Sequence, residues 1–414
     1  MGRRRHSHQA SICQNRARQK MRAVKLRIPG SFWDSQIYSG ELIIFVDDGS
    51  IQRIDWAAFV DRIAEKHPDV QTALRVAFSD SDLFYNPKVR KILGDPQIQH
   101  PITSQLDKLA DLQLEAEISS LSGHWQHNDS PFDFLPADTE IYHNEIYAGG
   151  EEGLFSFPRG ASLSKLKNRL EKHHDASVFQ VKASDRFSAI ATASGKDGLF
   201  DFLLARNPDD RKKVGTARQV ANRACSACDW AFQSIMGWSP ELAFLASFKE
   251  FKIPDTRKTT RVFNKIIEAS EIFGGGASSA NDVIWGSREK MYRLSDGHIT
   301  VSNYQTAGKA EAPDERFARV GEFTFSPISE IIATGTAAFG TVLEMENQIM
   351  VLRSDGGLDV FPGTPTHWRV FPRSEHYSNQ LHIVYEDALD IISFTHDYFV
   401  NQKDKAFGFA KATD

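Results

Sequence analysis

Residues 190–204, IATASGKDGLFDFLL, place two short apolar segments on either side of a Lys-Asp-Gly turn. Glycine preceded by Asp tolerates the positive φ values that a tight hairpin turn requires, so this stretch predicts two antiparallel strands joined by a hairpin. Four other stretches have the same form, with an Asp-Gly or Glu-Gly pair between apolar segments: 43–56 around Gly49, 146–157 around Gly153, 291–304 around Gly297 and 349–361 around Gly356. The sequence therefore predicts a protein built from repeated β-hairpins.

The spacing of these hairpins indicates a regular repeat. Successive turn glycines are 104, 45, 99 and 59 residues apart, which fits a period of about fifty residues if one member is missing from each long interval. Residues 72–86, with a Ser-Asp turn near residue 80, and residues 228–251, with a Ser-Pro turn near residue 239, supply the missing members. Seven units result, and the last continues through residues 380–399 as two further strands.

A repeat of this length is typical of a β-propeller. One small four-stranded sheet cannot bury both of its faces, so it stacks against the next sheet around a ring. We therefore predict an all-β fold, a β-propeller of about seven four-stranded blades. An early strand at residues 23–28 would pair with the C-terminal strands and close the ring. The alternative is a pair of β-sandwiches joined by helices.

Two segments carry a resemblance to a known family. Residues 185–202, DRFSAIATASGKDGLFDF, resemble the middle of a WD40 repeat, where a similar pattern crosses the turn between the second and third strands. Residues 48–56, DGSIQRIDW, end in Asp-Trp where that family often has Trp-Asp, but the Gly-His pair of the family is absent at the expected offsets. The resemblance therefore implies the WD40-like propeller shape, and no named family, for residues 22–400.

The domain organisation follows from this repeat. Residues 22–400 are predicted to form a single propeller domain, and residues 401–414 a C-terminal tail. Apolar residues at spacings of three and four predict helical insertions near 56–67, 104–121 and 162–174. Insertions of this kind commonly decorate one rim of a propeller, where partners bind.

The N-terminal segment 1–21 is strongly basic and begins with the run Arg3, Arg4 and Arg5. It is predicted to be an inert disordered tail, a region preceding a true start at Met21, an arm for nucleic acid or anionic lipid, or an Arg-rich targeting segment. Residues 1–20 hold six Arg and Lys and no Asp or Glu, so the remainder carries a formal charge of −11 against −5 for the whole chain. Nucleic acid is therefore expected as a partner only through this arm.

Composition indicates a globular protein, with 41% hydrophobic and 25% charged residues. The sequence lacks a run of eighteen apolar residues and lacks the apolar stretch of an export signal, so we expect no membrane span and no classical secretion. The three cysteines, Cys13, Cys225 and Cys228, are too few to staple a chain of this length. We therefore expect a reducing compartment and a cytoplasmic location.

Searches for catalytic or metal-binding motifs give only weak signals. Cys225 and Cys228 have the CxxC spacing of half a zinc site, but the other half is missing, so buried structural thiols are favoured. His124 and His127 are three residues apart in a segment with the composition of a loop, where the spacing does not favour a metal. The sequence also lacks a Gly-x-Ser-x-Gly motif. We predict no catalytic residue, no bound metal and no cofactor.

The predicted loop 122–138 contains three aromatic residues, Trp125, Phe132 and Phe134. Exposed aromatic side chains are typical anchors for a protein partner, and the alternative is that they pack over the edge of a blade. The sequence thus predicts a protein-interaction scaffold or a recognition subunit of an intracellular multiprotein complex, in preference to an enzyme. The alternatives are a propeller enzyme with a site in the central channel and a nucleic-acid-associated factor that uses the basic arm.

Overall fold

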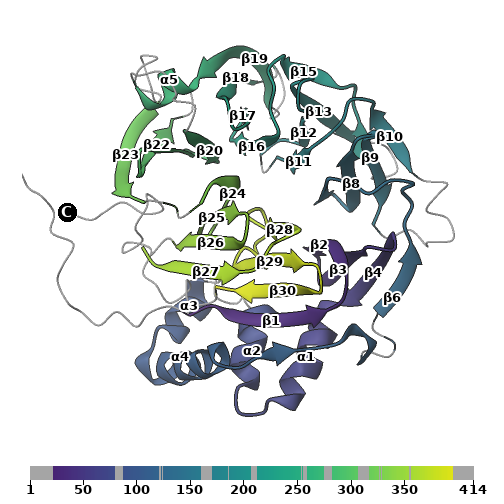
Figure 1. The fold of residues 1–414 in the computed structure, drawn as a ribbon, viewed down its shortest axis with the longest axis vertical. Coiled ribbons are helices and arrows are strands. Elements are labelled where there is room, and N and C mark those ends of the chain that lie inside the picture. Colours follow the sequence, from purple (N-terminus) through teal and green to yellow (C-terminus); the bar gives the residue numbers. More distant parts are fainter. Residues whose placement is uncertain are drawn as a thin grey trace, which may run out of the picture.

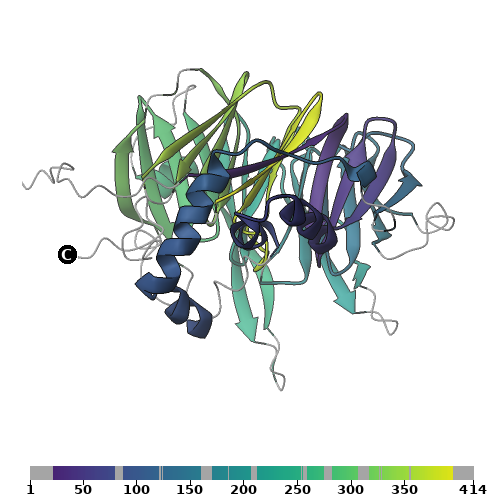
Figure 2. The same cartoon turned by 90° about the horizontal axis from the view of Figure 1, so that it is seen from below.

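Seven β-sheets stand as blades around a central axis, so the predicted all-β propeller is confirmed (Figure 1). The computed structural model describes residues 22–79, 87–120, 123, 125–159, 170–184, 186–206, 212–252, 254, 259–274, 282–305, 317–325, 327, 329–353 and 356–394. Seen edge-on in Figure 2, the blades stand side by side and the helices lie outside the ring.

Six blades consist of strands that follow one another along the chain, and the innermost strand comes first. Blade 1 contains β2 (Phe32–Tyr38), β3 (Glu41–Val46), β4 (Ser50–Asp55) and β6 (Trp125–Asp129). Blade 2 contains β7 (Asp138–Tyr142), β8 (Glu145–Gly150), β9 (Gly153–Pro158) and β10 (Glu171–His174). Blade 3 contains β11 (Gln180–Ala183), β12 (Ala189–Ala193), β13 (Leu199–Arg206), β14 (Lys212–Val214) and β15 (Arg218–Ala221). Blade 4 contains β16 (Ala227–Ala231), β17 (Ser234–Trp238), β18 (Ala243–Lys252) and β19 (Thr259–Glu268). Blade 5 contains β20 (Val283–Ser287), β21 (Lys290–Ser295), β22 (His298–Tyr304) and β23 (Phe317–Thr324). Blade 6 contains β24 (Ile331–Ala337), β25 (Gly340–Met345), β26 (Gln348–Arg353) and β27 (Leu358–Pro362).

Blade 7 joins the two ends of the described chain. It contains β28 (His367–Val370), β29 (Gln380–Tyr385), β30 (Ala388–Ser393) and the early strand β1 (Val24–Pro29). The register of β1 against β30 runs from Val24 opposite Ser393 to Pro29 opposite Ala388. This pairing confirms the predicted ring closure. Without β1, β30 would be an open edge of the sheet.

The prediction of a hairpin at residues 72–86 is wrong, because α2 (Gln71–Phe78) occupies its first half and residues 80–86 lie outside the described residues. Ala73, Leu74 and Ala77 are buried at the spacing of a helix face, a pattern that a short apolar run does not distinguish from a strand. The number of blades is nevertheless seven, because residues 380–393 belong to a seventh blade and do not extend the sixth.

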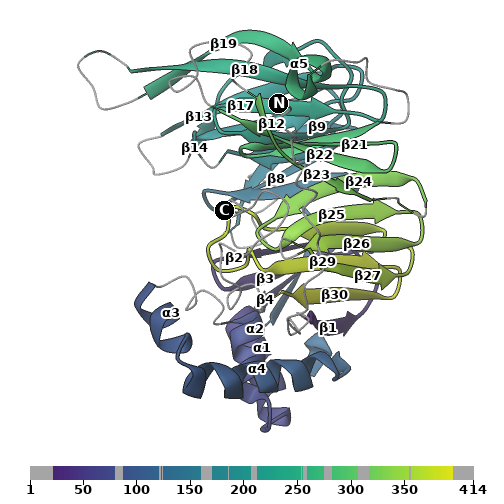
Figure 3. The same ribbon diagram turned by 90° about the vertical axis from the view of Figure 1, so that its left-hand side faces the viewer.

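A helical insertion separates β4 from β6 of blade 1. It contains α1 (Trp56–Lys66), α2, α3 (Pro87–Leu93), α4 (Pro96–Ala110), the short strand β5 (Leu114–Glu115) and the 3-10 turn Ile118–Ser120. Asp55 caps α1 by accepting a hydrogen bond from the Ala58 N–H (3.1 Å). The helices lie outside β1 (Figures 1 and 3), and β5 pairs with β1 in parallel. Within the described residues, no helix has the length and apolarity to cross a membrane.

The three predicted insertions have different outcomes. The helix predicted at 56–67 corresponds to α1, whereas the one predicted at 104–121 begins earlier, at Pro96, and ends at Ala110. The third prediction, 162–174, is wrong at its end, because Glu171–His174 is the outer strand β10, paired with β9. Residues 162–169 lie outside the described residues, as do the tail 401–414 and the basic segment 1–21.

The predicted turn glycines all adopt positive φ values, between 74° and 118° for Gly49, Gly153, Gly198, Gly297 and Gly356. Four of them join the second and third strands of a blade, but Gly356 joins the third and fourth. At Gly198 an added Cβ would lie 2.2 Å from the Ala221 carbonyl oxygen. Glycine there permits both the turn and the close approach of the outer strand.

The hydrophobic core lies between the blades. One buried cluster combines Met236 of blade 4, Tyr292 of blade 5 and Leu343 of blade 6, and the Trp285 and Tyr292 rings stack with centroids 5.2 Å apart. A buried ion pair, Arg261 with Asp201, also joins blades 4 and 3. Each blade is therefore held by its neighbours, as expected for stacked sheets with two apolar faces.

Candidate functional site

A cavity of about 1080 Å³ occupies the centre of the ring. Its walls are formed by the innermost strands of all seven blades, β2, β7, β11, β16, β20, β24 and β28. Such a cavity is the place in a propeller where side chains from distant parts of the sequence converge, so it is the candidate functional site.

Residues 371–379, between β28 and β29, lie across one end of this cavity. This loop of blade 7 lines the cavity and is bonded to blades 5, 2 and 1. Its bonds run from Arg288 Nη2 to the Pro372 carbonyl oxygen (2.7 Å), from Arg373 Nη2 to the Ile141 carbonyl oxygen (3.2 Å) and to Glu140, and from the Gly40 N–H to Tyr377 Oη (2.9 Å). A ligand would therefore enter from the other end.

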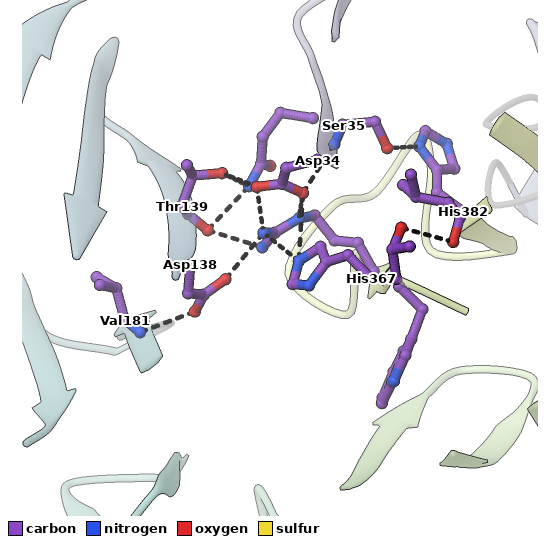
Figure 4. A network of polar contacts seen from close by, with 12 residues as sticks. Asp34, Ser35, Asp138, Thr139, Val181, His367 and His382 are labelled. Atoms are coloured by element: carbon purple, nitrogen blue, oxygen red, sulfur yellow. Dashed lines mark hydrogen bonds and ion pairs between the residues drawn. The ribbon is translucent and has the colours of Figure 1, made fainter. Parts of the chain in front are cut away.

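A buried polar network joins blades 7, 1 and 2 at that other end, and we call it the junction network: Asp34, Asp138, Thr139, His367 and Arg369 (Figure 4). Arg369 donates to both Asp34 oxygens, at 3.0 Å from Nε and 2.7 Å from Nη2, which is the bidentate geometry of a strong pair. Arg369 Nη2 also donates to Asp138 Oδ1 (2.8 Å), and Nη1 donates to the Thr139 carbonyl oxygen (2.7 Å).

The electrostatics of the junction network keep both of its central groups charged. Burial alone would raise the pKa of Asp34, but the Arg369 guanidinium and His367 bring it far below its ordinary value. Burial would lower the pKa of Arg369, but Asp34 and Asp138 raise it above its ordinary value. The ion pair therefore persists across the physiological pH range and ties the three blades together.

His382 extends this region without becoming a base. It is buried on β29, and its Nδ1 lies 2.9 Å from Ser35 Oγ (Figure 4). Burial, reinforced by the nearby Arg369 charge, lowers its pKa to about 3. His382 is therefore neutral at physiological pH, and its role is to form a hydrogen bond with Ser35.

The adjacent blade 6 side of the cavity has a different character, and we call it the blade 6 wall: Ser329, Glu330, Ile332, Thr334, Thr336 and Glu344. The Oγ atoms of Ser329, Thr334 and Thr336 are buried and have no hydrogen-bond partner among the described residues. Glu344 accepts a hydrogen bond from Trp368 Nε1 (2.8 Å), and burial raises its pKa above the ordinary value although that bond lowers it.

Two large apolar side chains lie exposed in the cavity lining. Phe179, just before β11 in blade 3, is 53% exposed, and Ile332, on β24 in blade 6, is 59% exposed. Most exposed apolar residues of a protein are scattered, but a pair of them within a cavity marks a surface that a ligand can cover.

The three aromatic residues singled out from the sequence lie elsewhere. Trp125–Asp129 is the strand β6, so the prediction that this segment is a loop is wrong there. Phe132 is only 6% exposed, and its ring lies 5.4 Å from those of Phe134 and Phe157. Packing over a blade edge therefore describes Phe132 and Phe134, whereas Trp125 is half-buried; their role as partner anchors stays a prediction.

The other residues that the sequence suggested as functional do not form a reactive site in the cavity. Cys225 and Cys228 are buried free thiols, and burial raises the pKa of Cys225 to about 12 and that of Cys228 well above its ordinary value. His127 lies on β6, while His124, Arg3, Arg4 and Arg5 lie outside the described residues. Across the described part of the chain, no group of three or more His, Cys, Asp or Glu side chains could hold a metal ion.

Sequence reasoning missed the junction network, although a signal for it exists. The innermost strand of blade 1 contains Asp-Ser-Gln-Ile-Tyr at 34–38, and that of blade 2 is Asp-Thr-Glu-Ile-Tyr at 138–142. These two motifs are 104 residues apart, which is also the separation of the turn glycines Gly49 and Gly153. The matching offset places both Asp residues in the first half of an innermost strand, where Arg369 binds them.

Two solved structures have a limited similarity to this chain. A chain in a crystal structure of a mitotic checkpoint complex is 9% identical, with a TM-score of 0.46 over 95% of this chain and 99% of that chain. The β-propeller domain of Myceliophteria thermophila Cps50 (Swd1) is 9% identical, with a TM-score of 0.39 over 62% of this chain and 96% of that chain. Neither a protein-family model nor a curated protein matches the sequence. The class defined by the fold is a seven-bladed β-propeller.

Proposed function

We propose that this chain is a protein-interaction scaffold, a recognition subunit of a multiprotein complex, and that it holds a segment of its partner in the central cavity. The observation that carries the proposal is the cavity itself, with loop 371–379 across one end and with Phe179 and Ile332 exposed in its lining. Rigid sheets that present exposed apolar side chains are suited to binding a partner by burying those side chains.

The size of the cavity supports a chain segment as its occupant. Its volume of about 1080 Å³ is at the upper limit of small-molecule pockets, which span roughly 300–1,000 Å³. A peptide that enters such a cavity gains affinity by burying a few anchors, while the rim excludes water around them.

Affinity purification from the source cells tests the proposal. The tagged native chain is expected to recover a stoichiometric companion, and Ile332→Asp is expected to lose most of it, because a charge would have to be buried at the contact. Ile92→Asp, on α3, is the matched control, since Ile92 is also 59% exposed. Recovery of the native chain alone, or equal recovery by both variants, would contradict the proposal.

A cytoplasmic location is part of the proposal. It is supported by the unpaired state of Cys225 and Cys228, because free thiols are stable in a reducing compartment. Fluorescence microscopy of the tagged full chain is expected to show a cytoplasmic signal, and a signal confined to another compartment would contradict it.

A further inference from the structure

The cavity is lined by far more acidic than basic side chains. Eight Asp and Glu residues line it, against three Lys and Arg residues, Lys182, Arg369 and Arg373. Three of the eight carboxylates are bound by guanidinium groups, Asp138 by Arg369, Glu140 by Arg373 and Asp282 by Arg293, and the other five outnumber the one remaining lining cation, Lys182. The cavity therefore presents a negative potential to a ligand, and its low-dielectric walls strengthen that potential.

The blade 6 wall adds hydrogen-bonding capacity that the described residues do not use. Thr334 is only 8% exposed and lines the cavity, yet its hydroxyl has no partner among the described residues. A buried polar atom without a partner is costly, so a bound group that bonds to it gains the corresponding free energy. Ser329 and Thr336 present the same unused oxygens on this wall.

The same wall also combines charge with apolar surface. Glu344 is half-buried and is oriented by the hydrogen bond from Trp368 Nε1. Gly335 makes this arrangement possible, because an added Cβ would lie 2.6 Å from the Trp368 ring. Ile332 and the exposed Glu330 line the cavity from the same blade, whereas the register of β24 against β25 places Thr334 on the face of the sheet opposite to that of Glu344.

We propose that the partner segment presents a Lys or Arg side chain to the blade 6 wall, where Glu330 and Glu344 bind the cationic group and Ile332 contacts its aliphatic stem. Lys and Arg are the side chains that join a cation to an apolar stem of this kind. Their N–H groups donate to carboxylates, which matches Glu330 and Glu344 on this wall. The inference rests on the proposed function and names the chemistry of the bound segment.

A peptide array tests this directly with the full chain. The probes are pools of nonapeptides with randomised flanks and a central residue fixed as Lys, Arg, Gln or Glu. We expect retention of the Lys and Arg pools to exceed that of the Gln pool by about tenfold, equivalent to about 1.4 kcal/mol. Glu344→Gln is expected to remove most of this preference, and Glu330→Gln part of it.

Glu115→Gln is the matched control, because Glu115 is an exposed carboxylate on β5 in the helical insertion. It should leave the preference unchanged, and thermal unfolding of each variant verifies that it is folded. Equal retention of the Gln pool, a preference for Glu, or a Lys and Arg preference that survives both variants overturns the inference. In those cases the proposed function stands if retention still requires Ile332, whereas retention of no pool, with no companion in cells, contradicts both.

Discussion

Two neighbouring regions of the central cavity use polar residues in opposite ways. In the junction network, Asp34, Asp138 and Arg369 bind one another across three blades, and their charges are compensated within the protein. On the blade 6 wall, buried hydroxyl oxygens have no partner among the described residues, and Ile332 is exposed. The difference indicates that the first region holds the ring together and that the second is suited to bind something from outside.

The position of the junction network explains why its charged groups are paired with one another. Blade 7 combines strands from both ends of the described chain, so no peptide bond connects β30 to β1 within that blade. The ring is closed there by noncovalent contacts alone, and Arg369 of blade 7 extends these contacts to blades 1 and 2. A region that closes the ring is stabilised when its polar groups are all paired within the protein. A binding surface, in contrast, needs polar groups that remain available to a partner.

The largest effect is expected from breaking the junction network. Arg369→Met keeps much of the side-chain volume but leaves the carboxylate of Asp34 buried without its guanidinium partner. Removal of one partner of a buried pair costs about 3–5 kcal/mol of unfolding free energy. Urea unfolding followed by tryptophan fluorescence measures this loss.

Arg62→Met provides the control, because Arg62 pairs with Glu65 on the exposed surface of α1, where such pairs contribute below about 1 kcal/mol. Adding Asp34→Asn to Arg369→Met should recover part of the loss, since it removes the uncompensated charge. A similar loss in Arg62→Met and Arg369→Met would show that the junction network does not hold the ring.

One substitution made in both regions sharpens the comparison. Thr139 Oγ1 donates to Asp34 Oδ2 (2.5 Å) and accepts from Gln36 Nε2 (3.0 Å), so Thr139→Val should cost about 1.5–3 kcal/mol, as for hydrogen bonds to charged groups. Thr334→Val on the blade 6 wall should change stability by less than about 0.5 kcal/mol, because its hydroxyl has no partner to lose among the described residues. Thermal unfolding of both variants measures the contrast, and equal losses would contradict the distinction between the two regions.

The fold could be predicted from the sequence to the extent that local chemistry determines it. Gly297 and the other turn glycines mark hairpins because positive φ is a local requirement. The helix α2 was mistaken for a strand because Leu74 and its neighbours form an apolar run too short for its period to decide. The junction network depends on Asp34 and Arg369, which are more than 300 residues apart in sequence and meet only when the ring closes.

The blade 6 wall was beyond prediction for another reason. Its character depends on which hydroxyls remain without partners, and that is a property of the assembled cavity. Thr334 and Thr336 read as ordinary strand residues in the sequence, where β-branched side chains are common. Only the packing of blade 6 against its neighbours distinguishes them from Thr139 in blade 2, which has two side-chain hydrogen bonds.

The smallest effect concerns the pH dependence of stability on the blade 6 wall. Burial raises the pKa of Glu344 in the folded protein above its ordinary value of 4.5. Its contribution to stability is therefore fully present below that value and is lost as the pH rises through the raised pKa. Glu344→Gln removes the charge and keeps an acceptor for Trp368, so it should stabilise the protein by about 0.5 kcal/mol near pH 7 and by nothing near pH 3.5.

Urea titrations at the two pH values measure this difference, with the exposed Glu330→Gln as the control that should be neutral at both. The sign is opposite to that of Asp34, whose lowered pKa makes its contribution disappear as the pH falls. A stabilising Glu344→Gln would mean that the native protein retains a carboxylate at some cost to its stability, as binding sites often do. Destabilisation near pH 7 would instead place Glu344 with the residues that hold the ring together.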